Sequence, residues 1–247
     1  MKARFIIPVA ILILILFCPG LSAREIKLVY VNFPPYEDRV DGKPKGILVQ
    51  IVETAFNRAG IPFSMTYLPF QRGYSMVKEG RYDGLFNFYK IDKRLPHFDY
   101  STPIIENPLV FFIRKDSQMT FQALDDLTEK KIGIMIGYTY GSDFDQAGHF
   151  YKEEASAHEH HFRKLLFGRI DAYPCDKMVG IYTARKEGLI GEFKILPHPL
   201  KIMNGHIGFT KGKHMDVIGK INREIEQMKQ NREIHLIIDD YIMNNKI

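Results

Sequence analysis

The chain contains only two cysteines, Cys18 and Cys175, among its 247 residues. Cys18 lies in an N-terminal segment that we expect to be removed, so the mature protein keeps one thiol and cannot form an internal disulfide. Cys175 has no partner in any recognisable motif, and we expect it to be a buried structural thiol. Stability must therefore come from a hydrophobic core, which a chain of this size can supply.

Several sequence signatures of enzymes and nucleic-acid-binding proteins are missing. The chain has no G-x-S-x-G or H-E-x-x-H motif, and its glycines do not have dinucleotide or P-loop spacing. It has no run of basic residues, and a formal net charge of +5 is modest. Nucleic-acid binding is therefore not supported, and we expect neither an enzyme nor a bound cofactor.

The first 23 residues have the layout of a secretory signal peptide. Lys2 and Arg4 precede an uncharged apolar run over 5–17, and the small residues Ser22 and Ala23 follow it. The apolar run is shorter than the roughly 20 residues that a membrane-spanning helix needs. We expect cleavage near Ala23 and a periplasmic mature protein. Loss of two basic and no acidic residues lowers the net charge from +5 to +3.

Strand and helix patterns alternate in the first part of the mature chain. The predicted order is strand 26–31, helix 46–60, strand 63–67, helix 72–78 and strand 83–88. This order favours a parallel sheet with helices on its faces, in which ligands bind beyond the carboxyl ends of the strands.

A second series of elements follows and suggests a second lobe. Strands are predicted at 108–115, 131–137, 170–176, 193–198 and 205–210, and helices at 123–131, 138–147, 160–169, 177–188, 216–230 and onward through 237. Two α/β lobes fit this order better than one sheet.

Two charged residues follow predicted strands and are candidate ligand contacts. Arg94 comes just after the strand at 83–88, and its planar guanidinium suits a carboxylate, although a surface arginine is the alternative. Asp176 ends the strand at 170–176, where it could pair with an ammonium group, cap the next helix, or do both. The loop 137–141 could bind an anion at a helix start, or be a plain turn.

Three histidines, His158, His160 and His161, lie close together in the sequence. Metal ligands must converge on one point, whereas adjacent residues of a helix diverge. We expect a solvated helix start here and no metal site.

Four segments, in order, resemble the family 3 extracellular solute-binding proteins, the amino-acid receptors of ABC importers. They are PPYEDRVDGKPKGILVQIVETAFNRAG (34–60), MVKEGRYDGLFNFYKIDKRLPHFDYSTPI (76–104), LTEKKIGIMIGYTYG (127–141) and LLFGRIDAYPCD (165–176). The resemblance implies a type II periplasmic-binding-protein fold, in which two α/β lobes joined by two hinge strands close on a ligand. It places lobe 1 at 24–107 plus 207–247 and lobe 2 at 108–206.

The resemblance also assigns roles to individual residues. Arg94 matches the arginine that clamps the ligand α-carboxylate, and Asp176 matches the acid that receives the α-amino group. Phe33 falls where an aromatic ring stacks on the ligand. Tyr138 and Thr139 fall where a backbone N–H and a hydroxyl help to hold the carboxylate.

Some positions depart from the family pattern. Asn87 and Tyr89 stand where small polar residues are usual, so we expect a tighter and more aromatic pocket. Arg72, after the second strand, resembles a divergent branch of the family and could be a second anion contact or a brace within its lobe.

The resemblance leaves three functions open. A monomeric receptor for a small anionic or zwitterionic solute, an amino acid or a relative, would deliver it to an ABC permease in the inner membrane. A sensory receptor could use the same fold. A cyclohexadienyl-acid dehydratase would need a general acid. The candidates by location alone are Glu37, Asp92, Glu106 and Asp176.

Overall fold

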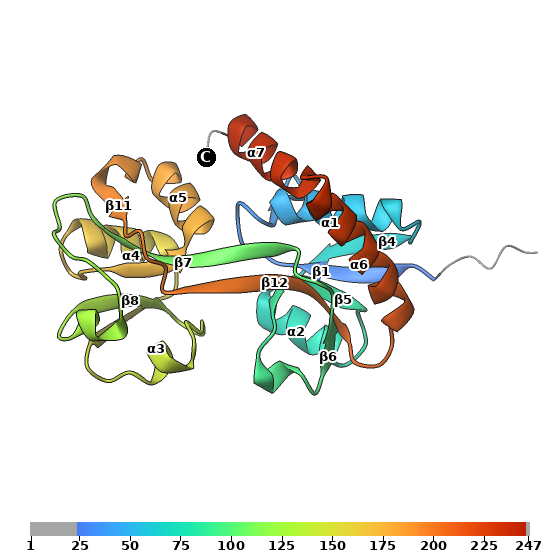
Figure 1. Ribbon diagram of the computed structural model, residues 1–247, viewed down its shortest axis with the longest axis horizontal. Helices are drawn as coiled ribbons and strands as arrows, with labels where there is room; N and C mark the ends of the chain where they lie inside the picture. Colours follow the sequence, from blue (N-terminus) through green and yellow to red (C-terminus); the bar gives the residue numbers. More distant parts are fainter. Residues whose placement is uncertain (1–23, 246–247) are drawn as a thin grey trace, which may run out of the picture.

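The structure is a computed structural model that describes residues 24–245. The predicted signal peptide at 1–23, with Cys18, lies outside the described residues. Two groups of helices and strands, which we call lobe 1 and lobe 2, are joined by two long strands that run side by side (Figure 1). These joining strands are β7 (Ile105–Arg114) and β12 (Lys201–Thr210).

Lobe 1 is built from both ends of the described chain. Its elements are β1 (Ile26–Tyr30), β2 (Asp38–Val40), β3 (Lys43–Lys45), α1 (Ile47–Arg58), β4 (Phe63–Tyr67), α2 (Phe70–Lys78), β5 (Gly84–Tyr89), the 3₁₀ turn η2 (Asp92–Arg94), β6 (Phe98–Tyr100), α6 (Met215–Gln230) and α7 (Glu233–Asn245).

Lobe 2 is formed by the chain between the two joining strands. Its elements are the 3₁₀ turn η3 (Leu124–Leu127), β8 (Lys131–Met135), α3 (Ser142–Gln146), β9 (Tyr151–Ala155), α4 (His158–Leu166), β10 (Tyr173–Asp176), α5 (Lys177–Lys186), the 3₁₀ turn η4 (Ile190–Glu192) and β11 (Phe193–Ile195).

The joining strands make one sheet continuous through both lobes. Its order is β10-β7-β12-β5-β1-β4, with β11 added on β7 and β6 added on β12. β7 and β12 are antiparallel, and Leu109 lies opposite Lys201 while Ile105 lies opposite Gly205. The lobe boundaries predicted near 107 and 206 fall within these two strands, and the division of the chain there stays a prediction.

The sheet of lobe 1 is covered by helices on both faces, as the β-α-β-α-β order predicts. β1 is parallel to β4 and β5, and alternate residues of a strand point to opposite faces. Leu28 packs in the cluster that holds the apolar faces of α1 and α6, whereas Val29 packs with Val77 of α2 and Leu85. Burial on both faces explains why β1 reads as a nearly continuous apolar run.

The same alternation divides the core of lobe 2. Phe111 of β7 packs in a cluster with Phe144 of α3, while the next residue, Phe112, packs against Phe162 of α4. β10 pairs with β7 in antiparallel register, with Cys175 opposite Val110. This pairing brings the end of β10, and so Asp176, beside the joining strands.

The structure differs from the sequence prediction at several elements. The helix expected over 123–131 is only the 3₁₀ turn η3, and the last helix continues to Asn245 rather than 237. The short strands β2, β3 and β9 were not predicted. β9 (Tyr151–Ala155) has the sequence YKEEA and lies parallel to β8 with mostly exposed side chains. A strand of this kind carries no alternating hydrophobic pattern that could reveal it.

Candidate functional site

The loop between β1 and β2 is fixed against the start of α1. The backbone N–H of Ile47 donates to the carbonyl of Pro35 over 3.1 Å, and that of Leu48 donates to the carbonyl of Tyr36 over 2.9 Å. The Tyr36 ring is buried and stacks on Phe33, with ring centres 5.9 Å apart. Two aromatic side chains are therefore held in place by the backbone of a helix N-terminus.

Asp176 is held at the end of β10 and makes contact across the lobes. Its Oδ1 accepts hydrogen bonds from the backbone N–H groups of Met178 (2.9 Å) and Val179 (3.0 Å), which confirms the predicted cap of α5. The Tyr36 hydroxyl of lobe 1 lies 3.0 Å and 3.2 Å from its two carboxylate oxygens. Asp176 is 3% exposed. This buried hydrogen bond joins lobe 1 to lobe 2.

Burial changes the acidity of this carboxyl group. It raises the pKa of Asp176 from its ordinary value of 3.8 to about 6, although the Val179 and Met178 N–H groups and the Tyr36 hydroxyl favour the charged form. An ammonium group placed against Oδ2 would favour the charged form further. Asp176 is therefore a carboxylate whose remaining hydrogen-bonding capacity suits a cation.

We expect wild type to lose stability relative to Asp176→Asn as the pH rises from about 4 to about 6. The folded pKa of Asp176 lies above the unfolded value, so in this interval the folded state binds more protons than the unfolded state, and the free energy of unfolding falls with pH. A shift of about 2 units corresponds to about 3 kcal/mol. Urea unfolding of both proteins across this range measures the difference, and a difference that does not change with pH would contradict the assignment.

Arg94 lies in η2 beside aromatic rings. Its Nη1 donates to the Tyr89 carbonyl over 2.8 Å, and its guanidinium carbon lies 4.2 Å from the centre of the Phe88 ring and 5.6 Å from that of Phe70. No ion pair joins Arg94 to an acidic side chain among the described residues. Burial lowers the pKa of Arg94, yet a guanidinium stays charged at neutral pH. The side chain is thus a half-buried cation without an anion.

Asn87 and Tyr89 are joined by a residue that sequence reasoning missed. Asn107 of β7 is fully buried, and its Nδ2 donates to Asn87 Oδ1 over 2.8 Å and to Tyr89 Oη over 3.0 Å. Burial and the nearby Asp176 charge raise the pKa of Tyr89. Because its oxygen accepts from Asn107, the Tyr89 hydroxyl proton is left to donate elsewhere. The only signal for Asn107 in the sequence is a polar residue at the start of an apolar strand.

The loop that follows β8 uses its polar groups internally. The Tyr138 N–H donates to the Met135 carbonyl over 3.2 Å, and the Thr139 hydroxyl donates to the Asp145 carboxylate. The Tyr138 ring is 49% exposed and makes an edge contact with His158, with ring centres 6.0 Å apart. In this structure the two donors predicted to hold a carboxylate are thus engaged with the protein itself, and their ligand role stays a prediction.

Arg72 takes part in none of these contacts. It is exposed on α2, and within residues 24–245 it makes no hydrogen bond or ion pair. Three of the eight predicted ligand residues, Phe33, Tyr138 and Asp176, lie in or beside the contacts between the two lobes. We call this region the interlobe surface and define it by Phe33, Tyr36, Tyr138, His158 and Asp176.

Comparison with known proteins identifies the family. The sequence pattern of the bacterial extracellular solute-binding proteins, family 3, matches residues 27–244. The chain belongs to this family. It is 21% identical to the L-cystine-binding protein TcyJ of Escherichia coli K12 over 217 residues, which cover 85% of this chain and 79% of that protein.

Solved structures support the same fold for this family 3 protein. The substrate-binding protein of an amino acid ABC transporter matches with a TM-score of 0.68 and 20% identity, covering 89% of this chain and 99% of that one. A histidine kinase sensor domain with similarity to periplasmic binding proteins matches with a TM-score of 0.74 and 18% identity, covering 89% and 96%. The fold is the type II periplasmic-binding-protein fold, as predicted.

Two further findings concern the part of the chain that the structure describes. Across residues 24–245, no helix has the length and apolar character to cross a membrane. In the same part of the chain, no group of three or more histidine, cysteine, aspartate or glutamate side chains is arranged to hold a metal ion.

The prediction of a solvated helix start for the three histidines is wrong for two of them. His161 is fully buried, its Nε2 lies 2.9 Å from the Ile134 carbonyl, and its ring stacks on Tyr173. His158 is partly buried and contacts Tyr173 and Cys175, and only His160 is exposed. α4 begins at His158, and part of its first turn faces the core. The polar sequence HEHH does not reveal this burial. The prediction that Cys175 is buried is confirmed.

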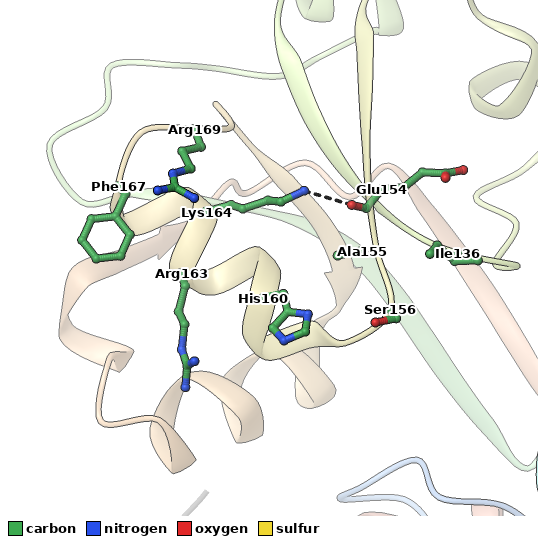
Figure 2. A pocket seen from close by; sticks show the side chains of 9 residues that line it. All are labelled: Ile136, Glu154, Ala155, Ser156, His160, Arg163, Lys164, Phe167 and Arg169. Atoms are coloured by element: carbon green, nitrogen blue, oxygen red, sulfur yellow. Dashed lines mark hydrogen bonds between the residues drawn. The ribbon is translucent and has the colours of Figure 1, made fainter.

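A pocket on lobe 2 contains none of the interlobe-surface residues in its lining. Figure 2 shows it between α4 and β9, with Phe167 at one edge and Ile136 at the other. The ammonium of Lys164 donates to the Glu154 carbonyl over 2.9 Å, and Arg163 pairs with Glu187 over 2.7 Å. None of the residues predicted to bind a ligand lines this pocket.

The acids considered for an enzyme differ in burial. Asp92 and Glu106 are exposed, whereas Glu37 is fully buried in lobe 1. Glu37 Oε2 accepts from the Val31 N–H over 3.1 Å, Oε1 has no partner among the described residues, and burial raises the pKa of the carboxyl well above its usual range. The matched family and its relatives above are binding proteins.

Proposed function

We propose that this chain is an exported receptor that closes on a small anionic or zwitterionic solute, an amino acid or a close relative, for ABC-type uptake. Arg94 holds the carboxylate, Asp176 receives the amino group, and Phe33 with Tyr138 contacts the rest of the ligand. Asn87 and Tyr89 shape the pocket near the joining strands.

The observation that carries the proposal is a pair of opposite charges on the two lobes. Arg94 of lobe 1 is a half-buried guanidinium without an acidic partner among the described residues, and Asp176 of lobe 2 is a buried carboxylate with capacity for one more donor. A zwitterion satisfies both charges only when the lobes are together. Ligand binding would therefore favour closure about β7 and β12.

The cellular setting follows from the N-terminal sequence and the family. The predicted signal peptide at 1–23 and the extracellular family support a periplasmic mature protein, which we propose to act as a monomer and to deliver its ligand to an inner-membrane permease. The likeness to a histidine kinase sensor domain supports a sensory receptor as the second candidate, because both functions use the same closure.

A thermal-shift screen of the twenty amino acids, L-cystine and small dicarboxylates tests the proposal. We expect at least one amino acid to raise the melting temperature of the mature protein, because a ligand that binds only the folded state stabilises it. The shift should be lost in Asp176→Asn. If no compound in the screen stabilises wild type, the amino-acid proposal is wrong.

A further inference from the structure

His158 lies between the two lobes and touches predicted ligand residues from both. Its ring centre is 6.5 Å from that of Phe33 on lobe 1 and 6.0 Å from that of Tyr138 on lobe 2. It is the first residue of α4, so its position is set by a helix packed in the core of lobe 2. The imidazole therefore belongs to the same surface as Asp176.

The hydrogen bonds at Nδ1 favour one tautomer of His158. The Tyr173 hydroxyl makes a short hydrogen bond to His158 Nδ1, and the Cys175 thiol lies 3.6 Å from the same atom. Tyr173 is fully buried, and within residues 24–245 its hydroxyl proton has two acceptors in reach, this nitrogen and the weakly accepting Cys175 sulfur. A nitrogen lone pair accepts an O–H better than a thiol sulfur does, so we assign Nδ1 as the acceptor of the Tyr173 proton and place the His158 proton on Nε2.

The Nε2–H group has no partner in the described part of the chain. The Nε2 atom is not fully buried, so this edge of the ring is open to solvent or to a ligand. Burial lowers the pKa of His158 from 6.5 to about 4. At neutral pH the side chain is therefore an uncharged imidazole that offers a single N–H donor.

The neighbours of His158 show which part of a ligand it would meet. Cys175, which it contacts, directly precedes Asp176, and Phe33, which it also contacts, stacks on the Tyr36 that bonds Asp176. If the α-amino group lies at Asp176 and the α-carboxylate at Arg94, the group that reaches His158 is the side chain of the amino acid.

We propose that His158 recognises the ligand side chain by donating its Nε2–H to an acceptor oxygen on that side chain. This inference rests on the proposed function. It predicts amino acids whose side chains end in an amide or carboxylate, over apolar side chains of equal length and over ammonium groups. An ammonium group is only a donor, and an apolar end would cover the N–H and leave it without a partner in the closed complex.

Isothermal titration with L-glutamine, L-glutamate, L-norleucine and L-lysine tests the selectivity. We expect L-glutamine or L-glutamate to bind wild type at least about tenfold more tightly than L-norleucine, the value of one hydrogen bond. His158→Phe should reduce this ratio to about one, while His158→Gln, whose amide can donate near the Nε2 position, should keep part of it. His160→Phe, at an exposed position of the same helix, is the control and should keep the wild-type ratio.

The outcomes separate this inference from the proposed function. If an amino acid binds wild type and needs Asp176, yet the ratio is unchanged in His158→Phe or wild type prefers L-norleucine or L-lysine, the inference is wrong and the proposed function stands. If no amino acid binds at all, both fall. A long-range ¹H–¹⁵N spectrum of the ligand-free protein gives an independent answer, because a proton found on Nδ1 of His158 would also overturn the inference.

Discussion

Arg94→Ala is expected to weaken amino-acid binding at least about a hundredfold. Removing one member of a buried charge pair leaves the other unpaired, which typically costs about 2 to 5 kcal/mol, and a hundredfold corresponds to about 2.7 kcal/mol. Among residues 24–245, the Arg94 side chain makes one hydrogen bond, to the Tyr89 carbonyl, and stacks on Phe88 and Phe70. Its loss should therefore change the melting temperature of the ligand-free protein only slightly.

Titration calorimetry with the amino acid found in the screen measures this effect. Arg94→Lys keeps the charge but not the planar fork, so an intermediate loss is expected. Arg81→Ala, which removes an exposed arginine paired with Glu79, serves as the matched control and should bind like wild type. Retention of near wild-type affinity in Arg94→Ala would exclude Arg94 as the carboxylate clamp.

Gly46→Ala is expected to lower the melting temperature by about 10 °C. Gly46 precedes α1 with φ of 143°, and a Cβ built there would lie 2.2 Å from the Tyr36 carbonyl oxygen. Both the backbone conformation and the contact with main-chain atoms oppose a side chain. The strained backbone costs about 1 to 3 kcal/mol, and the contact with main-chain atoms adds to this cost. A domain of this size loses about 2 to 4 °C per kcal/mol.

Differential scanning calorimetry checks the prediction, with Gly219→Ala as the control. Gly219 lies inside α6 and has nothing within 4 Å of its built Cβ. Alanine there should stabilise the protein by about 0.5 to 1 kcal/mol, because glycine is a poor helix former. A Gly46→Ala protein that melts within about 2 °C of wild type would show that the Tyr36 loop can move without strain.

The fold was predictable where local pattern and burial agree. The apolar faces of α1 and α6 recur at helical spacing, and the strands β1, β5 and β7 are largely buried on both faces, so each is visible in the sequence. β9 was not, because an exposed strand of sequence YKEEA carries no hydrophobic pattern. The pairing of β7 with β12 joins residues about a hundred positions apart, and no local signal encodes it.

The sequence predicted which residues are candidates for the site, but it did not predict the contacts that they make. Arg94 and Asp176 stand out because they follow strands and match the family pattern. Asn107 and His158 were not predicted as site residues, because their hydrogen-bond partners lie on other elements. A polar residue type alone does not show whether its side chain points inward. The hydrogen bond between Tyr36 and Asp176 joins residues 140 positions apart. It depends on the close contact of Gly46 with the Tyr36 loop, so only the folded chain reveals it.

The return of the chain along β12 sets the order in which the protein can fold as it is synthesised. One core cluster of lobe 2 draws on residues between Leu109 and Met203, so its members leave the ribosome in one stretch. The main core of lobe 1 needs Ile221, Ile225 and Met228 of α6 to cover α1, which was made more than 150 residues earlier. Lobe 2 can therefore assemble first, while the apolar face of α1 stays uncovered until the last helices emerge.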